Sequence, residues 1–118
     1  MRIGIVGSRK ANERVKVDML RLLPADVTEI VSGGAEGVDT YAAELANTLG
    51  IPVRNFLPDY DTYGKKAPLV RNLEIVDYAD EILAFWDGRS NGTRHTIAAC
   101  IQKGKPVRII PLSGEKDT

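Results

Sequence analysis

Short apolar runs alternate with stretches of helical periodicity along most of this chain. The apolar runs at 3–6, 27–32, 51–57, 81–86 and 106–110 predict five strands, and repeats at three- and four-residue spacing predict helices over 13–23, 38–49, 69–78 and 93–103. Residues 58–68 show no clear period, and their prolines and charges indicate the longest loop in the chain. In the last helix, Ile97 and Ile101 are expected to point inward.

Strands that alternate with helices form right-handed βαβ units, so the pattern predicts an α/β fold. We expect a three-layer α/β/α, Rossmann-like domain over residues 1–112, with a mainly parallel five-stranded sheet. The order 3-2-1-4-5 is preferred, because polar loops after the first and fourth strands would then flank the switch point where ligands bind. The polar residues 113–118 are expected to form a disordered tail.

Composition narrows the classes of function. The 118 residues include sixteen Lys plus Arg and sixteen Asp plus Glu, so the formal charge is zero. That balance lacks the broad basic surface of a protein that coats nucleic acid, so a nucleic-acid partner is expected to be unlikely. One His and one Cys cannot build a usual zinc site, and no metal or other cofactor is expected to be required. The N-terminal residues resemble neither a signal peptide nor a membrane span, which predicts a cytoplasmic protein with no membrane partner.

The second predicted strand runs into a glycine-rich loop and then directly into a helix. Three glycines in S-G-G-A-E-G leave bare backbone at this turn, and the following helix presents unpaired N–H groups and its positive end on the same side. Anions bind readily at such a helix start. The predicted contacts in this loop are Ser32, Gly33, Gly34, Ala35 and Gly37. Asp39 lies in the first turn of this helix, where a carboxylate interacts favourably with the helix dipole. The alternative role is a hydrogen bond to the loop or to a ribose hydroxyl.

The other loops at the carboxyl ends of the strands carry similar residues. Gly7, Ser8 and Arg9 combine flexible backbone, a hydroxyl and a guanidinium, which suits a phosphate or carboxylate. Arg71 and Asn72 at the third helix can reach over the same edge. After the fourth strand, Asp87 can accept from a ribose, and Asn91, Gly92 and Thr93 form either a helix cap or a phosphate seat. These loops predict a site for a nucleotide or a nucleotide-derived ligand.

Aromatic and titratable residues give weaker indications. Trp86 is expected in the core rather than stacked on a base, and Tyr60 and Tyr63 are weaker stacking candidates. Glu36, Asp39 and His95 are the candidate catalytic groups.

The order G-S-R, S-G-G-A-E-G-V-D, R-N and N-G-T resembles the SLOG superfamily, which includes the Rossmann-like core of DprA and the LOG phosphoribohydrolases. The likeness is greatest to small stand-alone members related to YpsA and YspA. It implies a nucleotide-derived ligand held between the two groups of loops, and relatives imply a homodimer.

Two departures from the family pattern bear on activity. LOG enzymes carry P-G-G-x-G-T-x-x-E, whereas only Gly92 and Thr93 match here and Thr96 replaces the glutamate. We therefore expect a nucleotide-binding protein, acting as a sensor or carrier. One alternative is a nucleoside-phosphate or ADP-ribose hydrolase that uses Glu36, Asp39 or His95, and another is a DprA-like single-stranded DNA binder.

Overall fold

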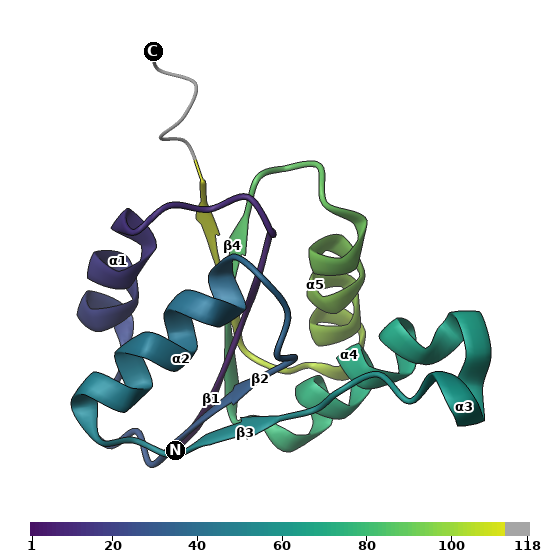
Figure 1. The fold of residues 1–118 in the computed structure, drawn as a ribbon, viewed down its shortest axis with the longest axis horizontal. Coiled ribbons are helices and arrows are strands. Elements are labelled where there is room, and N and C mark those ends of the chain that lie inside the picture. Colours follow the sequence, from purple (N-terminus) through teal and green to yellow (C-terminus); the bar gives the residue numbers. More distant parts are fainter. Residues whose placement is uncertain (113–118) are drawn as a thin grey trace.

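The computed structural model describes residues 1–112, which form a five-stranded sheet between helical layers (Figure 1). The strands are β1 (Arg2–Gly7), β2 (Glu29–Ser32), β3 (Val53–Asn55), β4 (Glu81–Trp86) and β5 (Val107–Pro111). The helices are α1 (Arg14–Leu22), α2 (Val38–Leu49), α3 (Tyr60–Tyr63), α4 (Ala67–Tyr78) and α5 (Asn91–Lys103), with a 3₁₀ turn, η1 (Gly64–Lys66), before α4. The predicted tail at 113–118 lies outside the described residues.

The sheet confirms the predicted order and direction. Its strands follow β3-β2-β1-β4-β5 and every neighbouring pair is parallel. The chain crosses to the other side of β1 after β3, so the loops that follow β1 and β4 diverge at the switch point. Gly7 is paired with Phe85 at that carboxyl edge.

Alternate side chains of the central strands form two cores, one on each face. Ile5 and Phe85 face the core under α1 and α2, whereas Val6 and Ala84 face the core under α4 and α5. The run 82–85 in β4 is at most 1% exposed, as expected for a strand covered on both faces. Cys100 is also fully buried in the second core.

The prediction of a loop at 58–68 is wrong in part, because this segment contains α3, η1 and the start of α4. Asp59 caps α3 by accepting a hydrogen bond from the Thr62 amide at 3.1 Å. A single turn is too short to show a helical period in the sequence. Helix α4 begins at Ala67 rather than Leu69, because Pro68 in the first turn gives up no intrahelical hydrogen bond.

The expected inward position of Ile101 is also wrong, since this side chain is 69% exposed. Helix α5 turns Thr93, Thr96, Ile97 and Cys100 toward the sheet instead, so small and hydroxyl side chains replace part of the expected apolar stripe. Helix α5 starts at Asn91, two residues earlier than predicted. Trp86 packs against the second core and donates its indole N–H to the Ser90 carbonyl at 3.1 Å, which confirms its core role.

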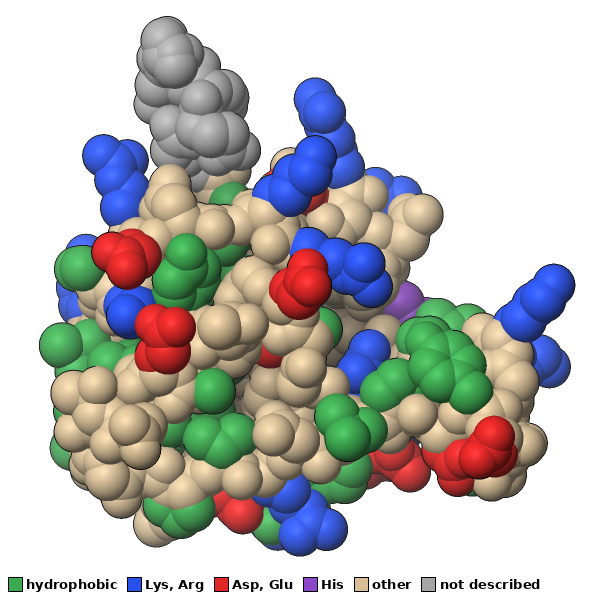
Figure 2. All heavy atoms as spheres, viewed as in Figure 1, with side chains coloured by type: hydrophobic (Ala, Val, Ile, Leu, Met, Phe, Trp, Pro, Cys, Tyr) green, Lys and Arg blue, Asp and Glu red, His purple; other side chains and the backbone are tan. Residues whose placement is uncertain are grey.

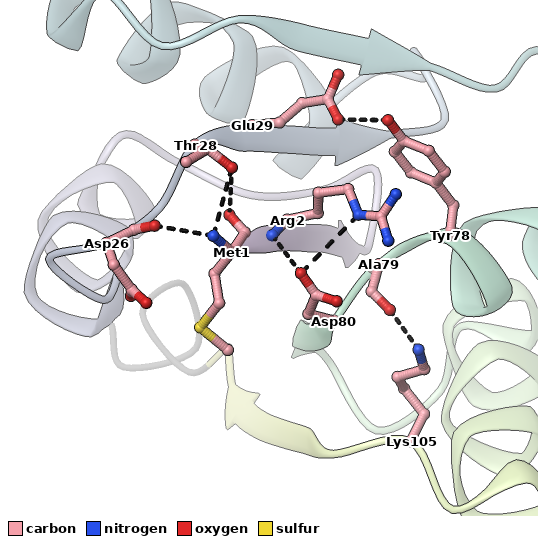
Figure 3. Close-up of polar contacts among 9 residues, drawn as sticks. All are labelled: Met1, Arg2, Asp26, Thr28, Glu29, Tyr78, Ala79, Asp80 and Lys105. Carbon is pink, nitrogen blue, oxygen red and sulfur yellow. Dashed lines mark hydrogen bonds and ion pairs between the residues drawn. The ribbon is translucent and has the colours of Figure 1, made fainter.

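A polar cluster closes the amino edge of the sheet (Figure 3). The Arg2 guanidinium lies 4.3 Å from the centre of the Tyr78 ring and its Nε lies 3.8 Å from Asp80. Tyr78 donates its hydroxyl to Glu29 at 2.6 Å, which links α4 to β2 across β1. The Arg2 amide also donates to Asp80 at 2.7 Å and holds the pKa of that carboxyl below its usual range.

We predict that Tyr78→Phe lowers the free energy of unfolding by about 1 kcal/mol, because it removes one hydrogen bond to a carboxylate and keeps the ring. Urea unfolding measures this change. Tyr60→Phe is the matched control, since the Tyr60 hydroxyl makes no hydrogen bond within residues 1–112. Equal stability of the two variants would show that the hydrogen bond between Tyr78 and Glu29 contributes nothing measurable.

Candidate functional site

A cavity of about 860 Å³ lies at the carboxyl edge of the sheet. It brings together ten of the residues predicted from the sequence: Gly7, Arg9, Gly33, Ala35, Asp39, Arg71, Asn72, Asp87, Gly92 and Thr93. Several further residues line the cavity that were not predicted from the sequence, among them Lys10, Leu69, Arg89, Ser90 and Thr96. Loops from both sides of the switch point therefore converge on one space.

Five predicted contacts do not line this cavity: Ser8, Ser32, Gly34, Gly37 and Asn91. Ser8 is buried, shares a 2.9 Å hydrogen bond with the Ser90 hydroxyl, and accepts from the Asp87 amide at 3.3 Å. Ser32 is buried as well and accepts from the Gly34 amide at 3.2 Å. The two serines thus support the walls of the site from behind.

Two amides of the glycine loop that were expected to bind a phosphate already donate hydrogen bonds to side chains of the protein. The Ala35 amide donates to the Asp39 carboxylate at 3.0 Å, and the Gly34 amide donates to Ser32. Burial raises the pKa of Asp39, and the Ala35 amide and the charge of Arg71 oppose that shift only in part. Asp39 therefore holds the loop, and the expectation of free loop amides is wrong at Gly34 and Ala35.

Close packing explains two of the glycines. A Cβ at Gly7 would lie 2.5 Å from the Phe85 carbonyl oxygen, and one at Gly37 would lie 2.2 Å from the Arg9 carbonyl oxygen. Gly37 also has φ +77°, which side chains rarely tolerate. Gly37 thus brings the start of α2 against the loop that follows β1, which places Arg9 at the cavity.

Arg71 and Asn72 span the cavity from α4. The Arg71 guanidinium donates to the Gly33 carbonyl at 3.0 Å and to the Asn72 side-chain oxygen at 3.0 Å. Asn72 then donates to the Gly92 carbonyl at 3.4 Å and lies 3.5 Å from His95 Nδ1. One chain of hydrogen bonds therefore connects the glycine loop to the start of α5.

Asp87 shapes the loop before α5. Its carboxylate accepts from the amides of Arg89 and Ser90, both at 2.8 Å, and from the Ser90 hydroxyl at 2.9 Å. The two amides are the main cause that lowers the pKa of Asp87 to about 2. Because its oxygens already accept these bonds, Asp87 serves as a loop and helix anchor.

The cavity is lined by more cationic than anionic side chains. Arg9, Lys10, Arg71 and Arg89 line it, and none of them forms a salt bridge within residues 1–112. The two lining carboxylates, Asp39 and Asp87, accept hydrogen bonds from the loops. The site therefore presents positive charge, and guanidinium groups suit phosphate oxygens.

The structure separates the three catalytic candidates. Asp39 lines the cavity, whereas Glu36, which is exposed, and His95 do not. Thr96, at the position of the LOG glutamate, is 1% exposed and donates its hydroxyl to the Gly92 carbonyl at 3.1 Å.

The described residues hold no cluster of three metal-ligating side chains. In that same part of the chain, no helix has the length and apolar character needed to cross a membrane.

Solved structures share this fold. DprA from Streptococcus pneumoniae matches with a TM-score of 0.79 and 21% identity, over 98% of this chain and 52% of that one. DprA from Helicobacter pylori matches with a TM-score of 0.74 and 22% identity, over 98% of this chain and 67% of that one. The chain thus spans about half the length of the pneumococcal protein, and it has a DprA-like fold.

A sequence relative gives the particular family. The chain is 38% identical over 117 residues to the gene 61 protein of Mycobacterium phage D29, which covers 90% of this chain and 93% of the phage protein. The chain therefore belongs to the family of that gene 61 protein. A scan against protein-family models found no match.

The expectation that a nucleic-acid partner is unlikely is wrong. It relied on the zero net charge, but the chain shares the fold of H. pylori DprA, a protein described by its single-stranded DNA binding mode. The total charge hid the local arrangement, because an excess of carboxylates elsewhere in the chain offsets the cations around the cavity.

We predict that Gly37→Ala lowers the free energy of unfolding by about 1–3 kcal/mol, because the added Cβ meets the Arg9 backbone and strains a positive φ. Gly92→Ala is the control, since a Cβ there meets nothing within 4 Å. Alanine in the helix should leave stability unchanged or raise it by up to about 1 kcal/mol. Denaturant unfolding that ranks the two variants in the opposite order would contradict the packing described here.

We also predict that Asp87 makes stability depend on acid pH. Its pKa falls from 3.8 to about 2 on folding, so its contribution is full above 3.8 and is lost as pH falls toward about 2. Asp87→Asn should remove that part of the dependence. Urea unfolding at about pH 6 and about pH 3 should show a smaller loss for Asp87→Asn than for the wild type. Parallel losses in both proteins would exclude this role.

Proposed function

We propose that the protein binds single-stranded DNA through phosphates placed in the cavity at the carboxyl edge of the sheet. The observation that carries the proposal is the group of Arg9, Lys10, Arg71 and Arg89, four lining cations with no salt-bridge partner among residues 1–112. Positive grooves that track the backbone are typical of proteins that bind single strands. The likeness to H. pylori DprA supports this ligand class.

The four cations have different tasks in this proposal. Arg71 is already held by Gly33 and Asn72, so its guanidinium is fixed in direction before a strand arrives. Arg9, Lys10 and Arg89 are exposed and make no side-chain hydrogen bond within the described part of the chain, so they remain available for phosphate oxygens. Binding would therefore combine one fixed contact with three adaptable ones.

Fluorescence anisotropy with a labelled single-stranded oligonucleotide tests the proposal. Four phosphate contacts predict that the logarithm of the binding constant falls with the logarithm of salt concentration at a slope of roughly −3, and loss of one contact should reduce it by about 0.7. Arg9→Ala and Arg89→Ala should each weaken binding by about tenfold.

The control for these variants is Arg21→Ala on α1, which removes an exposed arginine paired with Asp18 away from the cavity. It should retain wild-type affinity. Undetectable binding at low salt would overturn the proposal. Equal weakening in Arg21→Ala, Arg9→Ala and Arg89→Ala would place the strand outside the cavity.

A second candidate is a nucleotide or nucleotide-derived ligand in the same cavity. Its support is the volume of about 860 Å³ at the switch point, since small-molecule pockets commonly occupy about 300–1,000 Å³. Competition distinguishes the two ligands: mononucleotides, NAD or ADP-ribose that displace the oligonucleotide and raise the melting temperature of the wild type, but not of Arg9→Ala, would favour this candidate.

Finer assignments are part of the same proposal. We place the chain among the small SLOG proteins related to YpsA and YspA, as a cytoplasmic homodimer that needs no cofactor. The motif order G-S-R, S-G-G-A-E-G-V-D, R-N and N-G-T supports the subgroup.

A further inference from the structure

An arm of residues 57–66, which includes α3 and η1, carries exposed apolar and aromatic side chains. Tyr60 and Tyr63 are 58% and 45% exposed, and Leu57 is 65% exposed. The two tyrosines are three residues apart in one helical turn, so they lie on the same side of it. We call residues 57–66 the tyrosine arm. Figure 1 shows α3 projecting away from the layers that cover the sheet.

The tyrosine arm continues the wall of the cavity. Its last turn, η1, leads directly into α4, whose Pro68 and Leu69 line the cavity, and Leu69 is still 43% exposed. At the other end of the arm, Leu57 lies against the glycine loop, because a Cβ at Gly34 would come within 2.9 Å of its Cδ2 atom. Figure 2 shows a patch of hydrophobic side chains over the α3 region, with basic side chains beside it.

We infer that the tyrosine arm is a base-stacking surface, on which Tyr60 and Tyr63 hold the bases of the strand whose phosphates occupy the cavity. This inference rests on the proposed function. Aromatic rings beside a positive groove receive unpaired bases because every base has a π face, and such stacking tolerates any sequence. A double helix keeps its bases covered, so the arm selects single strands.

The charges of the tyrosine arm agree with a division of tasks. Asp59 and Asp61 balance Lys65 and Lys66, so the arm itself has no net charge to attract phosphates. The cations around the cavity supply that attraction. The arm then contributes apolar and aromatic contact, which predicts that base identity matters little and base presence matters much.

The test compares an oligothymidine with an abasic strand of the same length, which keeps the phosphates and lacks the bases. The wild type should prefer the oligothymidine by about tenfold or more, as expected for one stacked base. A double variant, Tyr60→Ala with Tyr63→Ala, should lose that preference and keep the affinity for the abasic strand. Replacement of both by Phe should restore the preference, because the rings return.

Val17→Ala with Leu20→Ala is the matched control. These side chains are also exposed, at 66% and 55%, and also three apart, but they lie on α1, in the helical layer on the other face of the sheet. This control should keep the wild-type preference for the oligothymidine. Circular dichroism would show that both double variants retain their secondary structure.

Three results would overturn the inference, and they differ from failure of the proposed function. Equal wild-type affinity for both strands, or an unchanged preference in the double Ala variant, excludes stacking but leaves phosphate binding intact. A wild-type dimer that the double Ala variant dissociates, seen by sedimentation, shows that a second copy covers the arm. Absence of binding to either strand at low salt removes the phosphate site as well.

Discussion

The hydrogen bonds of Arg71 and Asn72 determine the shape of the cavity. They connect α4 to the Gly33 carbonyl on one side and to the Gly92 carbonyl on the other. A second connection runs through Ser8, whose hydroxyl bonds to Ser90 and whose carbonyl accepts from the Val38 amide. Because Arg71 is both a structural donor and a cation in the cavity, the geometry and the charge of the site depend on the same side chain.

This arrangement changes how the glycine loop contributes to the site. Bare backbone next to a helix start is a common anion site, yet here Ser32 and Asp39 occupy two of the loop amides. Asp39 keeps its carboxylate buried and uses it within the protein. The glycines serve close packing, and side-chain cations supply the charge, so the site depends on long flexible groups for its contact with a ligand.

Much of the fold could be predicted from the sequence, because strand and helix periods are local signals and the polar loops indicated the strand order. Ten predicted site residues meet at the cavity because carboxyl ends of parallel strands share one edge. Contacts between distant segments could not be predicted. Lys10 follows the predicted Arg9 and Arg89 lies two residues after the predicted Asp87, but an exposed cation carries no sequence signal for its partner.

Short elements and small side chains explain the remaining differences between prediction and structure. Helix α3 is one turn long, and the only local signal for it is Asp59 three residues before Thr62. In α5, the i, i+4 spacing of Ile97 and Ile101 suggested one inward face, but Thr96 and Cys100 occupy that face. A hydrophobic pattern counts Thr as polar and so does not predict that Thr96 is buried. Its hydroxyl can be buried because it donates a hydrogen bond to the Gly92 carbonyl.

The central position of β1 has a consequence for how the chain folds. Its first partner, β2, lies close in sequence, with Ile3 opposite Ile30, whereas its second partner places Ile3 opposite Glu81. One edge of β1 therefore has no strand partner until β4 has been synthesised. Bringing together two strands so far apart in sequence slows folding, and during that interval the unpaired edge of β1 is open to strand exchange and aggregation.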